Sequence, residues 1–230
     1  MRAWMRMTNG REEGGPLPGL AELVVLSAEL STGDGASWRA ALEAARRTCD
    51  GTAIDETLLQ SYLFVGFPVV LNAFTVWREM AGAPRACADG DLESRREAGV
   101  ALCRRIYGRA YERLRDHVAG LHPDLDRWML EEGYGKTLSR PGLGSVEREL
   151  CVVSLLAAAG HLPQLRSHLR GALNVGAGVG AVDAALQAGL EVGCRNRGAP
   201  RQSDDDARNA WSDIRQRVER ECSSTTPESA

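Results

Sequence analysis

Two stretches of this 230-residue chain match each other at a fixed separation of 127 positions. Residues 22–66 align with residues 149–193 without a gap, and 14 of the 45 aligned pairs are identical. The identical pairs are spread along the whole stretch and include glycines, for example Gly33 with Gly160. Helical segments of similar composition match by chance at isolated positions, whereas a long match without gaps favours duplication. We therefore expect two related units in one chain.

Each copy has the pattern of three helices, because apolar residues recur at helical spacing between glycines that end each segment. In the second copy, Ser145 suits a helix N-cap, Gly160 ends that helix, and Pro163 suits the first turn of the next one. The Gly66-Phe67-Pro68 turn follows the third helix of the first copy and leads into a further helix. The helices expected from both copies lie near 20–31, 37–48, 54–64, 69–80, 145–159, 163–175 and 181–191.

The rest of the chain connects and extends these units. We expect a loop at 81–94, a helix near 95–117, a short helix near 123–131, and a Gly/Pro-rich loop at 133–142. A last helix starts at Ser203, and the tail SSTTPESA is expected to be disordered. The predicted organisation is a flexible tail (1–19), a first unit (20–80), a linker with a connecting helix (81–143), a second unit (144–195) and a C-terminal helix with a tail (196–230).

Composition narrows the class of protein. Ala, Leu, Val and Gly are plentiful and Phe is scarce, which suits closely packed helices and an all-α fold. The net charge is -3 and no region is strongly basic, so we expect no nucleic-acid partner. The six cysteines include no CxxC pair, and no metal-ligand spacing is present. The first 15 residues contain no apolar signal core, so we expect a cytoplasmic protein with reduced thiols.

One uncharged stretch is long enough to span a bilayer. It runs from Thr57 to Trp77, but it contains several polar residues and the Gly66-Phe67-Pro68 break. We interpret it as a buried helical hairpin and expect no membrane partner.

Glu149 and His168 are the strongest candidates for chemistry. Each lies on an otherwise apolar helix face, and the two helices are joined by a short turn, so their faces should meet. A carboxylate on such a face needs a partner or must become neutral, and an imidazole is a natural partner. The pair could orient the imidazole for general acid–base work near neutral pH. The spacing fits a buried contact that fastens two helices equally well.

Other polar residues surround this pair. His161 lies in the turn before His168 and could join the same pocket, although turn histidines are commonly solvated. Arginine binds carboxylates through two parallel hydrogen bonds, so one or two arginines of the second unit could anchor an acidic substrate. A solvated helix face is the alternative role for these arginines. Tyr134 and Lys136 lie in the Gly/Pro-rich segment, where binding residues often occur. The arginines in question are Arg140, Arg148, Arg166 and Arg170.

These segments resemble the carboxymuconolactone decarboxylase family. The resemblance is carried by GYGKTLSRPGLGSVEREL (133–150) and PQLRSHLRGALNVGA (163–177), and more weakly by LLQSYLFVGFPVVLNAF (58–74). It covers roughly residues 20–195. It implies an alkylhydroperoxidase-D-like helical bundle, internally duplicated here.

One branch of the family consists of thiol peroxidases. Its members carry a Glu, then a CxxC pair, then a His that three residues separate from the pair. The resemblance places that Glu at Glu149 and that His at His168, but the two cysteine positions hold His161 and Gln164. Without paired thiols there is no resolving step, so peroxidase activity is not expected.

The decarboxylase branch also lacks the cysteine pair. Its substrate is 4-carboxymuconolactone, and it needs no metal or organic cofactor. The resemblance implies that His168 donates a proton, Glu149 orients it, and His161 assists. Substrate binding would involve a carboxylate-binding arginine and residues near it. These substrate-binding candidates are Arg148, Arg166, Arg140, Tyr134 and Gln164.

Three functions remain open from the sequence. The first is a cofactor-free decarboxylase or related lyase acting on a small carboxylated lactone. The second is a non-catalytic helical assembly or ligand-binding protein of the same fold. The third is a thiol-dependent oxidoreductase that uses the scattered cysteines. Known decarboxylases of the family form ring-like homo-oligomers, so the resemblance also implies a homo-oligomer.

Overall fold

The protein is a bundle of helices. A computed structural model describes residues 17–83 and 91–224, with side chains described to residue 221, and these ranges contain helices and turns but no strand. The all-α prediction is confirmed. In chain order the elements are α1(Leu20–Thr32), α2(Gly35–Arg46), α3(Gly51–Ala81), α4(Leu92–Tyr107), the short 3-10 helix η2(Gly108–Ala110), α5(Tyr111–Leu121), α6(Pro123–Trp128), the π-helix η3(Met129–Leu138), α7(Ser145–Ala159), α8(Leu162–Asn174), α9(Val179–Arg197) and α10(Gln202–Ser224).

Helix ends follow the capping rules. The Asp34 carboxylate accepts hydrogen bonds from two backbone N–H groups at the start of α2, and Asp50 and Asp91 each accept one at the starts of α3 and α4. Gly160 adopts a left-handed conformation with φ 81° and ends α7, as its position in the sequence predicted. These signals locate the starts of α2, α3 and α4 and the end of α7 before tertiary packing is considered.

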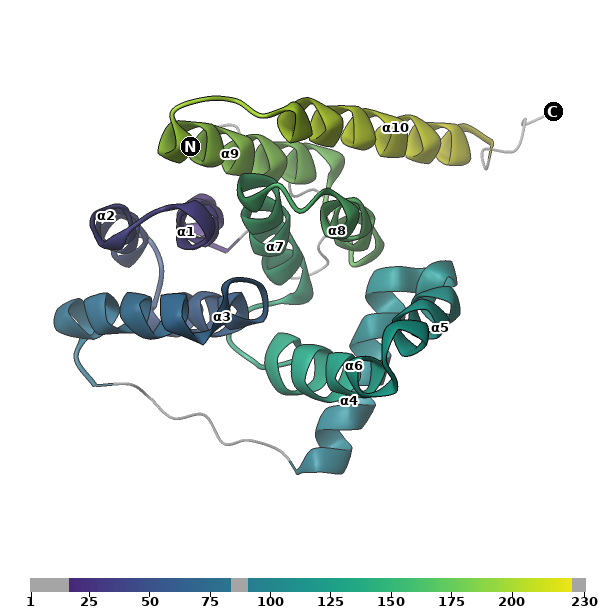
Figure 1. The fold of residues 1–230 in the computed structure, drawn as a ribbon, viewed down its shortest axis with the longest axis horizontal. Helices are drawn as coiled ribbons and strands as arrows, with labels where there is room; N and C mark the ends of the chain where they lie inside the picture. Colours follow the sequence, from purple (N-terminus) through teal and green to yellow (C-terminus); the bar gives the residue numbers. More distant parts are fainter. Residues whose placement is uncertain (1–16, 84–90, 225–230) are drawn as a thin grey trace.

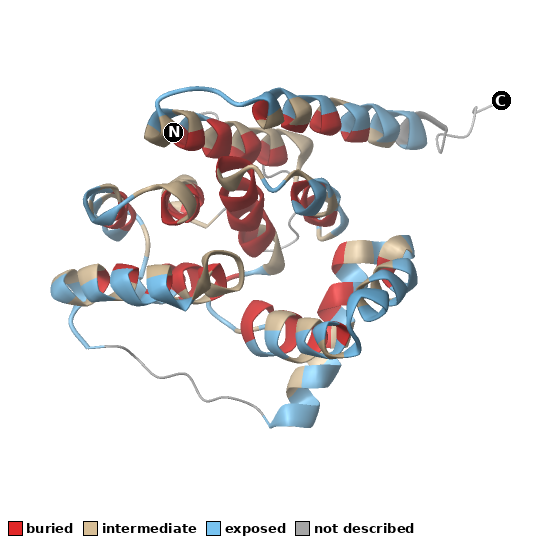
Figure 2. Ribbon diagram, in the orientation of Figure 1, coloured by how far each residue is buried: buried red, intermediate tan, exposed pale blue. Residues whose placement is uncertain are grey.

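The core is built around α7. Figures 1 and 2 show this helix in the middle of the molecule, and twelve of its fifteen residues are buried. It packs against α1, α8 and α9. Gly189 of α9 allows a close approach, since a Cβ there would lie 2.3 Å from the Ser154 carbonyl oxygen of α7. A helix that is covered on all sides can hold charged groups away from water, which matters for the site below.

The two predicted units share a helical plan. Shifting α1 and α2 by 127 positions places their first and last residues within two residues of those of α7 and α8. The third pair differs, because α3 continues to Ala81 whereas α9 stops at Arg197. Common descent of the two units remains a prediction, as do the unit boundaries.

Two connections differ from the prediction. The helix expected near 95–117 is interrupted at Gly108, whose φ of 52° separates α4 from α5. The Gly66-Phe67-Pro68 break, in contrast, is confirmed: φ is 78° at Gly66, and the two halves of α3 fold back so that Trp77 Nε1 donates to Asp55 over 2.6 Å. The first part of the predicted 133–142 loop is instead helical, within η3. Gly135 belongs to that helix because it packs on α4: a Cβ there would lie 2.2 Å from the Arg95 carbonyl oxygen. The predicted disordered tails lie largely outside the described residues.

Helix α3 is long and apolar enough to cross a membrane by length and composition alone. Its most apolar stretch has a mean hydropathy of 1.5, and 22% of that stretch is buried. The same properties occur in core helices of soluble proteins. Ile54 and Leu58 in its first half are fully buried in the core, while Phe67 and Leu71 beyond the kink are more than 60% exposed. The expected absence of a membrane partner stays a prediction.

Candidate functional site

Glu149 and His168 lie side by side, as their helix faces predicted. Glu149 comes from α7 and His168 from α8, and the Glu149 Oε2 and His168 Nδ1 atoms are 2.9 Å apart. Glu149 is 1% exposed and His168 is 6% exposed. Such a contact fixes the imidazole in one orientation, with Nδ1 held by the carboxylate and Nε2 on the opposite edge of the ring. The structure therefore brings the pair together, while its catalytic role stays a prediction.

Gly171 makes room for this contact. A Cβ on Gly171 would lie 2.8 Å from the Glu149 Oε2 atom and 2.7 Å from the Ile106 side chain. Gly171 follows His168 by three positions, so the two occupy neighbouring places on α8. Sequence reasoning missed this glycine because its role depends on packing against two other helices. Its position in the middle of a helix, where glycine is unfavourable, was the available signal.

Aromatic rings surround the imidazole. The Phe64 and Tyr107 rings meet His168 edge-on, with centroids 6.0 Å and 6.5 Å from the imidazole centroid. In the described part of the chain, the His168 Nε2 atom has no hydrogen-bond partner. This nitrogen is thus the one available to exchange a proton with a ligand.

Tyr134 lies behind Tyr107 rather than on a loop. Its hydroxyl donates a hydrogen bond to the Tyr107 hydroxyl over 3.0 Å, and only 5% of Tyr134 is exposed. Burial raises the pKa of both phenols well above the ordinary value, so both remain neutral hydrogen-bonding groups. Tyr134 therefore holds the Tyr107 hydroxyl through a hydrogen bond. Of the two tyrosines, Tyr107 lines the pocket that is described below. Sequence reasoning did not identify Tyr107.

His161 and Gln164 lie on the surface. His161 occupies the turn at the start of α8, Gln164 lies in its first turn, and both are exposed. Among the described residues, no hydrogen bond or ion pair joins either side chain to Glu149 or His168. The geometry thus separates the two positions that hold cysteines in the peroxidase branch from the buried pair.

Two of the thiols that the structure describes, Cys103 and Cys151, lie in environments that disfavour redox chemistry. Cys49, Cys103, Cys151 and Cys194 are all free. Cys103 and Cys151 are fully buried, and burial raises the pKa of each thiol to about 12. A reactive cysteine needs the opposite conditions, namely access to solvent and a lowered pKa.

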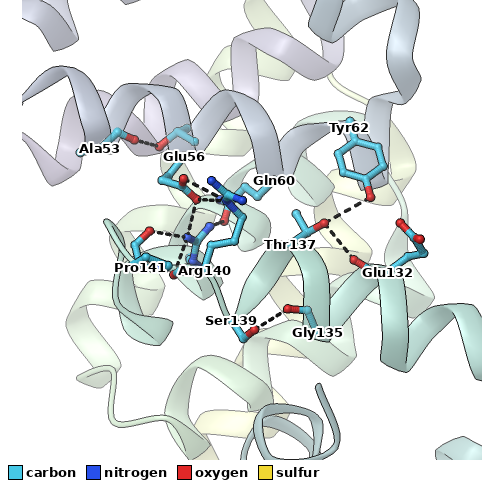
Figure 3. A network of polar contacts seen from close by, with 12 residues as sticks. Ala53, Glu56, Gln60, Tyr62, Glu132, Gly135, Thr137, Ser139, Arg140 and Pro141 are labelled. Atoms are coloured by element: carbon cyan, nitrogen blue, oxygen red, sulfur yellow. Dashed lines mark hydrogen bonds and ion pairs between the residues drawn. The ribbon is translucent and has the colours of Figure 1, made fainter. Parts of the chain in front are cut away.

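Arg140 and Arg148 belong to a separate buried network. The Arg148 guanidinium is 2% exposed, and its Nη2 donates to Glu56 over 2.9 Å and to the Arg140 carbonyl oxygen over 2.9 Å. Its Nη1 donates to Gln60 over 3.2 Å. Figure 3 shows Arg140 beside Glu56, where its Nε lies 3.1 Å from both carboxylate oxygens.

This network ties α3 to α7 and to the segment before α7. Burial lowers the pKa of the Arg148 guanidinium, and the hydrogen bond to Glu56 opposes that shift. Arg140 and Arg148, two of the arginines predicted to bind substrate, thus both pair with Glu56. Their environment is that of a structural ion pair inside the protein.

Arg166 lines a pocket of about 280 Å³ that is separate from the network of Arg148 and Glu56. Helices α4, α5, α8 and α10 and the short η2 contribute to its walls. Neither Glu149 nor His168 is among the lining residues, but Tyr107 lines the pocket and also packs against His168. Tyr107 therefore stands between the buried pair and the pocket. The lining residues are Ile106, Tyr107, Ala110, Arg113, Arg166, Ser167, Arg170, Asn174, Ala210, Asp213, Ile214 and Arg217.

Residues from α10 complete this pocket. Sequence reasoning identified Arg166 and Arg170 but not Asp213 and Arg217, because nothing in the local pattern shows that α10 packs on α8. No group of three or more His, Cys, Asp or Glu side chains that could hold a metal ion occurs within the described ranges.

Comparison with known proteins agrees with this architecture. The model of the carboxymuconolactone decarboxylase family matches residues 123–194, which include α7, α8 and most of α9. Peroxisomal protein 2 of Schizosaccharomyces pombe is 30% identical over 143 residues, which amount to 60% of this chain and 67% of that protein. The buried Glu149–His168 pair lies within the matched segment. The chain belongs to the carboxymuconolactone decarboxylase family.

Proposed function

We propose that this protein is a cofactor-free lyase that decarboxylates a small carboxylated lactone or a related acid. The observation that carries the proposal is the 2.9 Å contact between His168 Nδ1 and Glu149 Oε2 in a buried, aromatic environment. An imidazole held at one nitrogen and unbonded at the other can serve as a general acid. The buried thiols do not favour a peroxidase.

The proposed reaction needs no redox partner. The bond between the substrate carbon and its carboxylate breaks, carbon dioxide leaves, and the electron pair moves through the double bond into the lactone carbonyl. The electron pair then returns from the carbonyl oxygen to the carbon next to the carbonyl, which takes the proton of His168 Nε2–H, and solvent returns a proton to the imidazole. Glu149 keeps Nδ1 protonated and stabilises the imidazolium form. Arg166 would hold an acid group of the substrate in the pocket bordered by Tyr107.

The test is the release of carbon dioxide from 4-carboxymuconolactone, followed by proton NMR in D₂O so that carbon protonation is seen directly. His168→Asn should lower kcat by about 100-fold or more, because a positioned acid contributes that order of rate enhancement. Glu149→Gln keeps a hydrogen-bond acceptor but loses the charge, and should lower kcat less. His117→Asn, on the exposed face of α5, is the matched control. Full turnover by His168→Asn would refute the proposal.

A second candidate is a non-catalytic ligand-binding protein of the same fold. The observation in its favour is the near-complete burial of Glu149 and His168, neither of which lines the pocket. On this alternative, His168→Asn would lower thermal stability while ligand binding stayed unchanged and no turnover occurred in either protein. The same set of measurements therefore distinguishes the two functions.

The proposal also includes the location of the protein in the cell. The relative from Schizosaccharomyces pombe carries the word peroxisomal in its name, which describes that protein. For this chain we propose the cytoplasm, which microscopy of a tagged full-length chain would test.

A further inference from the structure

The pocket beside Tyr107 concentrates positive charge in a protein whose net charge is -3. Four of its lining residues are arginines and one is an acid, Asp213, so the pocket itself is strongly cationic. Within the described residues, none of these four guanidinium groups forms an ion pair or a hydrogen bond. By contrast, Arg115, Arg127 and Arg197 all pair with carboxylates nearby. The four arginines are Arg113, Arg166, Arg170 and Arg217.

The helices arrange these arginines around one space. Arg166 and Arg170 are one helical turn apart on α8, and Asp213 and Arg217 are one turn apart on α10, which packs against α8. Arg113 reaches the same pocket from α5. The arginines are exposed, so their charged groups are accessible to a ligand from solvent.

The floor of the pocket is apolar. Ile106 and Ile214 are buried, and the half-buried Tyr107 offers an aromatic ring. A ligand that fits must therefore combine a highly charged end with an apolar or aromatic body. A single carboxylate would engage one guanidinium fork and leave the other arginines without a partner.

We propose that this pocket binds a small organic diphosphate, that is, an apolar or aromatic body that carries two linked phosphate groups. Guanidinium groups bind phosphate oxygens through paired hydrogen bonds, and several of them can share one diphosphate. The charge of a diphosphate matches the excess of arginine over acid in the pocket. This inference does not require the lyase reaction.

Part of the specificity for this ligand would come from residues outside the segment that matches the family model. Arg113, Asp213 and Arg217 lie outside residues 123–194, whereas Arg166 and Arg170 lie within them. A protein of the same family without these α5 and α10 residues would keep the Glu–His pair but not the cationic pocket.

Isothermal titration calorimetry of the full chain at low ionic strength tests the proposal, with inorganic pyrophosphate and ADP as probes. We expect saturable binding that weakens as salt is added, and tighter binding of ADP because its body covers the apolar floor. Arg170→Gln and Arg217→Gln should each weaken pyrophosphate binding by about tenfold, the order of a charge-assisted hydrogen bond. Arg215→Gln, two positions away on α10 and outside the pocket lining, is the matched control and should bind normally.

Two further measurements sharpen the result. Asp213→Asn removes the acid from the pocket and should tighten pyrophosphate binding by about threefold. Tricarballylate, a trianion made of carboxylates, should bind more weakly than pyrophosphate.

The diphosphate proposal is overturned if tricarballylate binds more tightly, if pyrophosphate does not bind, or if Arg215→Gln weakens binding as much as Arg217→Gln. His168→Asn should keep its pyrophosphate affinity, so failure of the lyase proposal and failure of this one are separate outcomes.

Discussion

Arg148 and Arg166 illustrate two different uses of the same side chain. Arg148 is buried and donates to Glu56 and Gln60, whereas Arg166 is exposed at the pocket rim. We predict that Arg148→Met destabilises the protein by about 3 kcal/mol, because Glu56 would lose one of its two charged partners inside the protein. Arg166→Met should change the free energy of unfolding by less than about 0.5 kcal/mol. Urea unfolding curves measure both values, and equal effects would contradict the structural role given to Arg148.

The buried thiols give a second prediction at this scale. A thiol with a pKa near 12 is protonated in all but about one molecule in ten thousand at pH 8. Cys103 and Cys151 should therefore resist iodoacetamide in the folded protein, and raising the pH from 7 to 9 should not make them reactive. The half-buried Cys194 serves as the internal comparison and should react first. Mass spectrometry of the alkylated peptides reports each site, and rapid labelling of Cys103 would revive the thiol-dependent alternative.

Residue-level prediction succeeded where a local pattern carries the information. The meeting of Glu149 and His168 follows from two helix faces and one short turn, all visible in the sequence. The pairing of Arg148 with Glu56 does not, because it joins residues 92 positions apart. A polar residue on an apolar helix face indicates that this residue needs a partner. Which residue serves as the partner depends on the tertiary fold.

At the scale of elements, glycines serve two purposes in this chain. Gly160 ends a helix, whereas Gly99 and Gly135 allow α4 and η3 to approach each other. A Cβ on Gly99 would lie 2.1 Å from the Leu130 carbonyl oxygen, which belongs to a backbone that cannot move aside cheaply. The Gly/Pro-rich segment was thus predicted as a loop on the strength of composition, while Gly135 within it is a packing residue in a helix.

This distinction can be tested with one pair of variants. Gly99→Ala should destabilise the protein by about 1–3 kcal/mol, since overpacking outweighs the better helix propensity of alanine. Gly120→Ala, in α5, has no atom within 4 Å of the new Cβ and should stabilise by about 0.5 kcal/mol. Thermal melting of both variants measures the difference. A stabilising Gly99→Ala would show that α4 and η3 do not pack this closely.

At the scale of the whole molecule, the described chain has a large apolar core and a smaller one. The large core gathers α1, α2, α3 and α7 to α10, and the smaller one lies among α4, α5 and η3. Figure 1 shows α4, α5 and α6 set to one side of the central α7. The sequence predicted the helices but not this division, because it arises from long-range packing. Assembly into a homo-oligomer stays a prediction for sedimentation analysis.

The unequal burial of the helices predicts unequal local stability. Twelve of fifteen residues in α7 are buried, but Tyr111 is the one buried residue of α5. Besides Tyr111, α5 is held by the ion pair of Arg115 with Asp126 of α6. Hydrogen exchange of backbone amides should therefore be slowest in α7 and faster by orders of magnitude in α5, which can open without exposing the large core. Denaturant distinguishes the two routes, because amides that exchange through global unfolding accelerate steeply with urea and those that open locally do not. Equal protection and equal urea dependence in α5 and α7 would instead mean that the two cores unfold as one cooperative unit.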